Sequence, residues 1–490
     1  MEPYIEINGN KARLFGEFSS QILSDLDLEL SFKPAGIEFS PAVRNHRFDG
    51  RTRLLSSNLS FPIGLVNRVV RFFEDYSIKI KVIDNNIYSQ PYEIDISDKL
   101  KQLNIVPRDY QIAACEVAVN KKTGILKAAT GSGKTLIAAL IIAKVGRGKK
   151  CIVYVIGKSL LWQFKSLFDK LFPGQVGVIG DGICDIKDIN ICSIWSVGMA
   201  FGAKEKIEEF DDVQEKKVSQ AHFNNIRNLV SSSDVTLVDE VHLGSTTTIQ
   251  KIIKSTYSQF LIGLSATPQR SDNSQLLIEG GFGNVIVNIS ASELIAKKYL
   301  VQPIIRFISI PKIRYSKDMN YKQIYSDYVV NNDVRNNIII KGTLSLIEQN
   351  FSTVVLFREL AHGKILHDKF TDKKLNFATL SGKDSSDDRK AALDDLDSGK
   401  IKLILASSIF NVGVDAPILS GLVNAGVGKS RIATLQKVGR CVRTYANKDM
   451  AAIIDFYDQC RYLRDHSIYR KETYEQEPGF KVIPSKEMKE

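Results

Sequence analysis

The sequence predicts an α/β protein with two tandem doubly wound parallel-sheet domains, preceded by a small α+β domain. Short apolar runs, each followed by Gly, Ser or Thr and then by a helical pattern, occur in two groups, at about residues 105–295 and 335–460. The 490 residues also exceed the roughly 250–300 residues that one hydrophobic core usually supports. In such sheets, ligands bind at the carboxyl ends of the strands.

The apolar runs are rich in Val, Ile and Leu, as expected of buried parallel strands. We expect strands over Gly124–Ala128, Cys151–Ile156, Val235–Val238, Phe260–Leu264, Thr353–Phe357 and Lys402–Ala406. The domain boundaries that follow are an N-terminal domain at 1–100, a first α/β domain at 101–297, a connector at 298–334, a second α/β domain at 335–465 and a tail at 466–490. The connector contains a strand-like segment, Gln302–Ile310.

Composition sets limits on partners and location. The 66 Lys and Arg against 55 Asp and Glu give a net charge of +11, which suits a polyanionic partner and also fits an ordinary basic protein. The sequence has no run of 18 apolar residues and its start lacks the order of a signal peptide, so we expect a cytoplasmic protein with no membrane partner. The scattered cysteines lack metal-ligand spacing and indicate reduced thiols: Cys115, Cys151, Cys184, Cys192, Cys441 and Cys460.

A phosphate-binding loop follows the first predicted strand. The residues Ala128-Ala-Thr-Gly-Ser-Gly-Lys-Thr135 stand between an apolar strand and an apolar helix, which is the context such a loop requires. Gly131 and Gly133 allow the backbone N–H groups of the loop, with Thr130 and Ser132, to turn toward phosphate oxygens. Lys134 can reach the β and γ phosphates, and the Thr135 hydroxyl can bind Mg²⁺. The pattern predicts ATP and Mg²⁺ as cofactors.

Two adjacent carboxylates end the third predicted strand. Asp239 offers a hard oxygen ligand for Mg²⁺, partly through water, and Glu240 is placed to orient and deprotonate an attacking water. Downstream of a phosphate loop, this catalytic interpretation is preferred to a helix cap. His242 has two open interpretations, a contact to the loop that senses phosphate or a structural histidine.

Taken together, A-x-T-G-S-G-K-T, D-E-V-H and Ser265-Ala266-Thr267 resemble the motor motifs of superfamily-2 helicases, which implies RecA-like domains and ATP hydrolysis. The resemblance implies that Arg108 and Gln111, in an R-x-Y-Q element, contact adenine. It implies that Gly413 and Asp415 belong to a loop that couples nucleotide to motion. It also implies nucleic-acid backbone contacts from Lys158, Ser159, Trp195, Ser381, Gly382 and Ser407.

The last motif, Gln436-Lys-Val-Gly439-Arg440-Cys-Val-Arg443, matches the element that carries arginine fingers. A guanidinium stabilises the charge that gathers on the γ-phosphoryl oxygens during hydrolysis. Arg440 and Arg443 are spaced one helical turn apart, so we expect both to face one cleft, with Gln436 as a further catalytic residue. A solvated basic helix face would be the alternative if the motif stood alone.

Two departures from the family pattern affect these assignments. The loop Gly157-Lys158-Ser159 replaces the commoner Pro-Thr pattern, so Lys158 takes the place of a threonine at the phosphate. The motif with the two carboxylates, at residues 239–242, is D-E-V-H and not D-E-A-D. This difference favours a protein outside the commonest group of RNA helicases.

The N-terminal region carries a basic cluster: Arg44, Arg47, Arg51 and Arg53, with Phe48 among them. Such residues can neutralise phosphates and stack on bases, although a basic surface turn is the simpler alternative. The strings Arg47-Phe-Asp-Gly-Arg-Thr-Arg-Leu-Leu55 and Phe61-Pro-Ile-Gly-Leu-Val66 resemble the N-terminal domain of UvsW-type helicases of tailed bacteriophages. That resemblance implies unwinding and branch migration of forked and junction DNA in recombination, replication and repair, inside an infected bacterial host.

Two alternatives use the same motor. An RNA or RNA-DNA helicase would share every motor motif, because loops that grip the backbone do not distinguish the sugar. A double-stranded DNA translocase would move without separating strands. Such proteins often carry nuclease motifs, and we find no convincing nuclease constellation in the sequence.

Overall fold

The structure is a computed structural model that describes the chain except for Met1 and residues 204–214, 268–273, 313, 317, 383, 408–415, 447 and 489–490. The chain forms two compact units, one within residues 1–289 and one from Ser290 onward, and the short segment Ala129–Ser132 groups with the second. The first unit contains the N-terminal domain and the first α/β domain. The predicted fold class is confirmed, with a parallel sheet in each unit.

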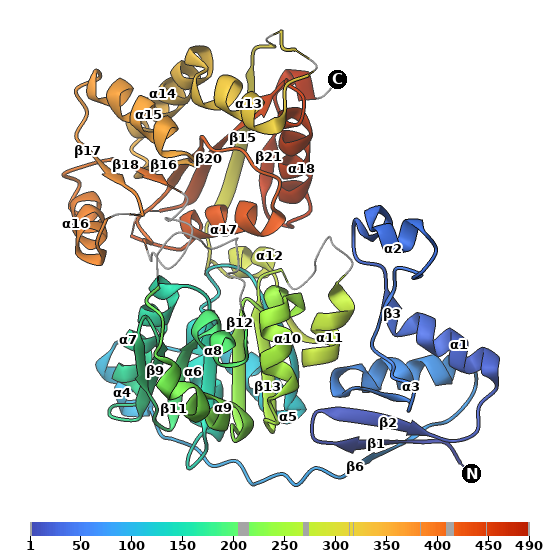
Figure 1. Ribbon diagram of the computed structural model, residues 1–490. Helices are drawn as coiled ribbons and strands as arrows, with labels where there is room; N and C mark the ends of the chain where they lie inside the picture. Colours follow the sequence, from blue (N-terminus) through green and yellow to red (C-terminus); the bar gives the residue numbers. More distant parts are fainter. Residues whose placement is uncertain are drawn as a thin grey trace. The chain divides into compact units, whose positions relative to one another are not determined.

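The N-terminal domain is a small sheet in the order β5-β2-β1-β6 with helices packed on it (Figure 1). Apolar residues alternate along β1 and β2, so one face of the sheet is buried against α1 and α3. A separate short pair, β3 and β4, lies in the segment that holds the basic cluster. The elements are β1 (Tyr4–Asn8), β2 (Lys11–Phe15), α1 (Ser20–Glu29), β3 (Ser31–Phe32), α2 (Pro41–Arg44), β4 (Thr52–Arg53), β5 (Ser60–Pro62), α3 (Val66–Asp75) and β6 (Lys81–Asp84).

The first α/β domain has, over the described residues, an eight-stranded sheet in the order β10-β9-β11-β8-β12-β13-β7-β14. Only the pairing of β10 with β9 is antiparallel among its described strands. The strands are β7 (Thr123–Ala128), β8 (Cys151–Val155), β9 (Val176–Gly180), β10 (Ile183–Asp185), β11 (Ile189–Ser193), β12 (Val235–Asp239), β13 (Phe260–Ser265) and β14 (Val285–Ile289).

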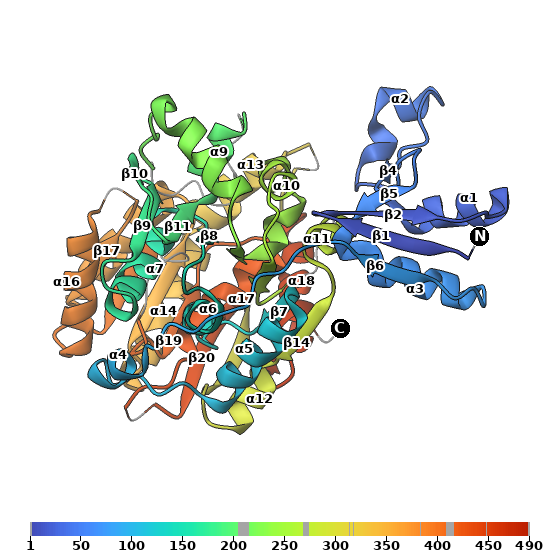
Figure 2. The ribbon, with the colours of Figure 1, turned by 90° about the horizontal axis from the view of Figure 1, so that it is seen from below.

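Helices cover both faces of this sheet (Figure 2). On one face α5 packs on α6 and α6 on α7, with α4 against α7; on the other, α8 packs on α9 and α10, and α10 on α11. The helices are α4 (Ser97–Gln102), α5 (Asp109–Lys121), α6 (Lys134–Val145), α7 (Lys158–Leu171), α8 (Ile194–Ala200), α9 (Phe223–Ser231), α10 (Thr247–Lys254) and α11 (Gln275–Phe282).

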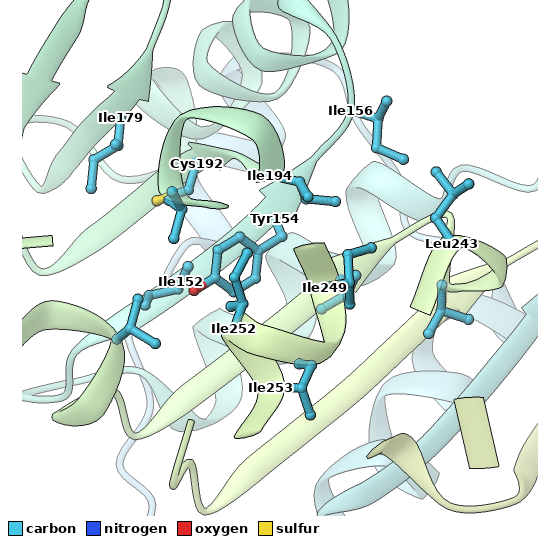
Figure 3. Close-up of a cluster of buried hydrophobic side chains, with 14 of the residues drawn as sticks. Ile152, Tyr154, Ile156, Ile179, Cys192, Ile194, Leu243, Ile249, Ile252 and Ile253 are labelled. Atoms are coloured by element: carbon cyan, nitrogen blue, oxygen red, sulfur yellow. The ribbon is translucent and has the colours of Figure 1, made fainter. Parts of the chain in front are cut away.

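The core on the second of these faces is a continuous apolar cluster (Figure 3). Ile152 and Tyr154 from β8 meet Ile249 and Ile252 from α10, and all four are almost fully buried. Removing this much apolar surface from water, at roughly 25 cal/mol per Å², holds the strands in register. The register in turn fixes where the strands end, and the candidate site is built at those ends.

The N-terminal domain is fastened to α10 and α11 of the first α/β domain. The Arg68 guanidinium pairs with the Glu279 carboxylate through contacts of 3.0 and 2.6 Å. The Asn10 amide donates to the carbonyl of Lys254 at the end of α10 (3.0 Å). Leu276 of α11 belongs to the apolar core of the N-terminal domain. The two domains therefore share buried apolar surface as well as polar contacts.

The second unit has, over its described residues, a seven-stranded parallel sheet in the order β17-β18-β16-β19-β20-β15-β21. Helices α14 and α15 cover one face, and α17 and α18 pack together against β19 and β20. The elements are α12 (Ala291–Ala296), β15 (Gln302–Ile310), α13 (Tyr321–Tyr325), α14 (Asp333–Glu348), β16 (Thr353–Phe357), α15 (Leu360–Thr371), β17 (Phe377–Leu380), α16 (Ser386–Asp397), β18 (Leu403–Ser407), β19 (Gly421–Asn424), α17 (Arg431–Cys441), β20 (Met450–Asp458), α18 (Leu463–Glu475) and β21 (Lys481–Ile483).

The segment 298–334, predicted as a connector, is instead part of the second unit. Its strand β15 pairs in parallel with β20 along nine residues and with β21 of the predicted tail. Farther along, Ile324 and Val329 are buried in a cluster with Leu463 of α18. The sequence suggested a connector because part of the segment is polar and Tyr-rich. Its strand β15 is apolar, however, and burial between β20 and β21 is more favourable for it than exposure to water.

Two expectations about composition can be compared with the structure. Among the described residues, no helix is long and apolar enough to cross a membrane. All six cysteines are free thiols, and five of them are buried. Burial raises the pKa of the Cys151 thiol to about 12, so this sulfur stays protonated and unreactive.

Candidate nucleotide and nucleic-acid site

The phosphate loop connects the end of β7 to the first residue of α6. Gly131 and Gly133 have φ of 87° and 79°, in the left-handed region that glycine enters without steric cost. The Ser132 N–H donates to the Ala129 carbonyl (3.1 Å), which tightens the turn. Helix α6 begins at Lys134, so its N-terminal N–H groups and the lysine stand together at the loop.

Gln111 lies directly against this loop. It is only 4 % exposed, and its Oε1 accepts the backbone N–H of Arg108 (2.9 Å) at the start of α5. A Cβ added at Gly133 would stand 2.5 Å from the Gln111 Nε2 atom, so the loop needs glycine for this approach. The structure thus places the R-x-Y-Q element next to the phosphate loop, and its contact to adenine stays a prediction.

The two carboxylates stand at the end of β12, between β8 and β13. Asp239 lies opposite Leu264 of β13, and Ser265 lies opposite Lys127 at the end of β7. Glu240 takes a left-handed backbone conformation (φ 53°), which turns the chain sharply after the strand. Its Oε1 atom lies 4.0 Å from the Lys134 Nζ atom, so register and turn bring the loop lysine and the carboxylate together.

Buried polar contacts connect Glu240 to the loop after β13. The Ser265 hydroxyl donates to Glu240 Oε2 (3.4 Å), and the Thr267 N–H donates to the Ser265 hydroxyl (3.2 Å). The His242 Nδ1 atom lies 3.2 Å from Glu240 Oε2 and 3.3 Å from Ser265 Oγ. His242 is fully buried and contacts the S-A-T loop, which was the first of its two interpretations.

Asp239 has the properties expected of a cation ligand. Burial, and then the neighbouring charge of Glu240, raise the pKa of its carboxyl to about 7, although Lys134 acts in the opposite direction. Its Oδ1 atom is buried with no hydrogen-bond partner among the described residues. Leaving a charged oxygen without a partner is costly, and a divalent cation removes that cost. The residues present fit Mg²⁺, with Thr135 partly buried one residue into α6.

The loops predicted to contact nucleic acid lie at the ends of β8 and β11 in the same sheet. The Lys158 Nζ atom pairs with the Asp181 carboxylate (2.8 Å), and the Trp162 Nε1–H donates to the same carboxylate (3.3 Å). Burial opposes ionisation of Asp181, but the contacts from Lys158 and Trp162 outweigh it and lower the pKa of the carboxyl. Ser159 and Trp195 are partly exposed beside these contacts.

A third carboxylate holds the hydroxyls of the β11 loop. Glu215 accepts from the Ser193 hydroxyl (2.7 Å), from the Ser196 hydroxyl (2.5 Å) and from the Asp181 N–H (3.1 Å). Both serines are essentially fully buried. Sequence reasoning did not identify Glu215 or Asp181 as site residues, because neither belongs to a recognisable motif.

In the second unit, the predicted contacts stand at the ends of β17 and β18. The Ser381 N–H and hydroxyl both donate to the Asp384 carboxylate (2.5 and 3.0 Å), in the turn that contains Gly382. The Ser407 hydroxyl is buried with no hydrogen-bond partner among the described residues, as expected of a donor that serves a ligand. Gly413 and Asp415 lie outside the described residues.

The predicted arginine fingers do not share a helix. Gln436 and Arg440 lie on α17, but that helix ends at Cys441. Arg443 forms an isolated β-bridge with Leu300, beside a hydrogen bond from the Val301 N–H to the Val442 carbonyl (2.8 Å). The expected helical spacing of the two arginines is therefore wrong, since α17 ends before Arg443. That both arginines face one cleft stays a prediction.

The arginines of the N-terminal domain differ in how they are held. Arg53 is engaged by Asp27 (2.8 Å) and by Asp49, and the Arg51 N–H donates to Asp49 Oδ1 (3.0 Å). Gly50 has φ of 79°, a backbone conformation that favours glycine. Arg44 and Arg47 are exposed, with the Arg44 guanidinium 5.6 Å from the ring centre of an exposed aromatic residue, Phe39.

Three family models match the chain, in the order expected of this architecture. The N-terminal domain of the DNA helicase UvsW matches residues 12–84, the res subunit of type III restriction enzymes matches 104–270, and the conserved C-terminal helicase domain matches 336–445. With the buried network that joins Lys134, Glu240 and Ser265, these matches define an ATP-dependent helicase of superfamily 2.

Among known helicases the chain resembles UvsW. It is 24% identical to the ATP-dependent DNA helicase uvsW of Enterobacteria phage T4 over 448 residues, which cover 87% of this chain and 85% of that one. A helicase-named protein of Sulfolobus islandicus filamentous virus is 29% identical over 72% of this chain, which spans only 64% of that relative's length.

Solved structures with this fold include helicases and restriction enzymes. The crystal structure of T4 UvsW aligns over 99% of both chains with 21% identity and a TM-score of 0.46. A fragment of an HsdR subunit of a type I restriction enzyme from Vibrio vulnificus aligns over 77% of this chain and 69% of its own, with 21% identity and a TM-score of 0.53. The second likeness supports the fold alone.

Proposed function

We propose that this helicase uses ATP and Mg²⁺ to unwind and branch-migrate forked or junction DNA in recombination, replication and repair. The observation that carries the proposal is the common edge of one sheet. The sheet has the order β11-β8-β12-β13-β7 in this region. The loops proposed to contact nucleic acid follow β11 and β8, and the proposed nucleotide site follows β12, β13 and β7. β8 and β12 are paired in parallel, so the two groups of loops lie next to each other at the same edge of the sheet.

The residues divide the work of hydrolysis. Lys134 neutralises the phosphates, and Glu240 orients the attacking water and takes its proton. His242 and Ser265 fix the Glu240 carboxylate and relay its position to Thr267. Thr135 and Asp239 would hold Mg²⁺, which supplies charge stabilisation for the phosphoryl oxygens.

Further contacts complete the proposal for the nucleotide. Arg108 and Gln111 contact the base, the loop with Thr130 to Gly133 binds the phosphates, and Gln436, Arg440 and Arg443 stabilise the charge that develops in hydrolysis. Gly413 and Asp415 couple that chemistry to motion.

DNA is proposed as the substrate because the N-terminal domain offers exposed basic residues and a relative that matches 87% of this chain is named a DNA helicase. Arg44 and Arg47 are the exposed arginines that would neutralise backbone phosphates, with Arg51 and Arg53 shaping the turn behind them. The phage relatives suggest an infected bacterial cell as the place of action.

A translocase is the second candidate, because the chain is also 24% identical to the DNA 3'-5' translocase XPB2 of Sulfurisphaera tokodaii over 77% of its length.

One experiment separates these candidates. ATP turnover should be measured without nucleic acid and with single-stranded, duplex, forked and four-way DNA and with RNA, and strand separation of each substrate should be followed on gels. Stimulation by DNA with separation of the branched substrates supports the proposal. Stimulation mainly by RNA indicates an RNA helicase, and turnover on duplex without separation indicates a translocase.

Lys134→Ala serves as the control for every substrate in this experiment. It removes the cation assigned to the phosphates, so turnover should fall to background with all of them. Unchanged turnover in this variant would reject the assignment of the nucleotide site itself.

A further inference from the structure

The side chain of Glu215 stands where a strand of nucleic acid is proposed to bind. Its two carboxylate oxygens receive the hydroxyls of Ser193 and Ser196 and the backbone N–H of Asp181, at 2.7, 2.5 and 3.1 Å. The donors come from the ends of β11 and β9 and from α8, so the fold brings them together from separate elements. A carboxylate with three donors is tightly held.

This set of donors suits a phosphodiester equally well. A phosphodiester carries one negative charge and two unesterified oxygens, as a carboxylate does, and protein hydroxyls and backbone N–H groups are common partners of backbone phosphates. Ser193 and Ser196 are 1 % and 0 % exposed, so their hydroxyls need an acceptor whether or not nucleic acid is bound. Glu215 satisfies them in the free protein.

The residues directly after Glu215 lie at the surface. Glu215 lies outside any helix or strand, and Lys216 and Lys217 after it are exposed. The segment is anchored at Val218, which is 3 % exposed and belongs to the apolar core of the first α/β domain. A Cβ at Gly180 would stand 3.1 Å from Glu215 Oε1, so glycine leaves room for the carboxylate.

A second carboxylate neutralises the lysine next to this position. Asp181 donates its N–H to Glu215 and pairs through its side chain with Lys158, the residue predicted to touch phosphate. The pattern recurs in the second unit, where Asp384 accepts from the N–H and hydroxyl of Ser381. Lys158 and Ser381, both predicted to contact the nucleic-acid backbone, thus each contact a carboxylate.

We propose that Glu215 occupies the position of a backbone phosphate in the free protein and is displaced when a nucleic-acid strand binds. The inference rests on the proposed function, because it assumes that the loops after β8 and β11 grip a strand. Displacement costs the contacts of the carboxylate, so it raises the nucleic-acid concentration at which the motor engages. A strand that presents several phosphates at once overcomes this cost more readily than a single phosphate does.

The first test compares Glu215→Gln with Glu116→Gln. Glu116 is exposed on α5, away from these contacts, so both variants change the net charge equally. Binding of a fluorescein-labelled single-stranded DNA oligonucleotide should be about 3- to 10-fold tighter for Glu215→Gln than for Glu116→Gln, which corresponds to roughly 0.7–1.4 kcal/mol. Equal or weaker binding by Glu215→Gln would overturn the inference.

Glu215→Asp separates displacement from charge. Aspartate keeps the negative charge but is shorter by one methylene, so it cannot hold both serine hydroxyls in the same way. We expect tighter binding than in the parent protein, and unchanged binding would overturn the inference. Because Glu215→Asp is the more conservative change, it can replace Glu215→Gln in the binding experiment if Glu215→Gln fails to fold, as judged by the loss of cooperative melting.

Ser196→Ala tests whether the freed hydroxyl binds phosphate. In the parent, this change removes a donor from both Glu215 and the strand, so binding should change little. In the Glu215→Gln protein, the Ser196→Ala change should abolish most of the gain in DNA affinity, whereas a gain in affinity that survives would contradict the proposal.

The failure of the inference can be distinguished from the failure of the proposed function. If none of the variants binds DNA or RNA, both are wrong. If the parent binds and Glu215→Gln behaves as Glu116→Gln, only the inference is wrong.

Discussion

The proposed hydrolysis of ATP depends on single side chains at the end of β12. Glu240 stands 4.0 Å from Lys134 and is held by Ser265 and His242. Glu240→Gln keeps the shape of the side chain but removes the base, so ATP turnover should fall by about 10²- to 10⁴-fold while ATP still binds. Steady-state turnover and fluorescent-nucleotide binding measure the two effects, and the carboxylate would have another role if turnover were preserved.

A buried histidine makes the stability of the second unit depend on pH. His362 is 0 % exposed, and its Nε2 atom lies 2.9 Å from Asn336 Oδ1. Burial, and then the positive charge of Arg335, lower the pKa of His362 to about 3 from its ordinary 6.5. The unfolded chain therefore gains a proton at this residue first as the pH falls, and the folded state loses about 1.4 kcal/mol per pH unit between pH 6.5 and 3.

His362→Gln should flatten this part of the stability profile. The contribution of the neutral histidine is fully present above pH 6.5, so the parent and the variant should diverge most in slope between pH 6 and 4. Urea unfolding followed at several pH values measures the slope. Identical slopes in the two proteins would show that His362 does not carry this dependence.

At the scale of elements, the close approach of the N-terminal domain to α11 depends on Gly64. A Cβ at Gly64 would stand 2.1 Å from the Glu279 carbonyl oxygen, a backbone atom that cannot turn away. Gly64→Ala should therefore cost about 1–3 kcal/mol of stability and loosen the Arg68–Glu279 pair. Thermal melting and limited proteolysis between residues 85 and 100 would report both effects.

Gly281→Ala is the matched control on the opposite side of this contact. Gly281 lies on α11, which Gly64 approaches, but an added Cβ there would meet only Ile253 at an ordinary 3.5 Å. Alanine has the higher helix propensity, so this variant should be as stable as the parent or more so. If both variants melted alike, the close packing at Gly64 would not be what fastens the N-terminal domain.

At the scale of the whole molecule, the net charge of +11 governs encounter with a polyanion. Nucleic-acid binding releases counterions, so its affinity should fall steeply with salt. Raising NaCl from 50 to 200 mM should weaken DNA binding by about 10-fold or more, with Arg44→Ala plus Arg47→Ala lowering the slope of log Kd against log salt by up to about 2. An unchanged slope in the double variant would remove these arginines from the interface.

Local patterns in the sequence were sufficient to predict the two parallel sheets and to name the candidate nucleotide residues. Apolar runs ending in Gly, Ser, Thr or acidic residues predict buried strands and their ligand-bearing ends, because both depend on neighbours in the sequence. The strand Thr353–Phe357 is confirmed residue for residue. Lys134 and Glu240 could be named in advance for the same reason, since a loop and a strand end are local patterns.

Only the tertiary structure decided which distant residues meet. Glu215 reaches Ser193 and Ser196, β15 enters the second sheet instead of serving as a connector, and Arg443 leaves the path of α17. None of these follows from local periodicity, because each depends on burial and hydrogen bonds between segments far apart in the chain. Strand register and close backbone packing are properties of the assembled fold, and they are what bring the carboxylates to the candidate nucleic-acid loops.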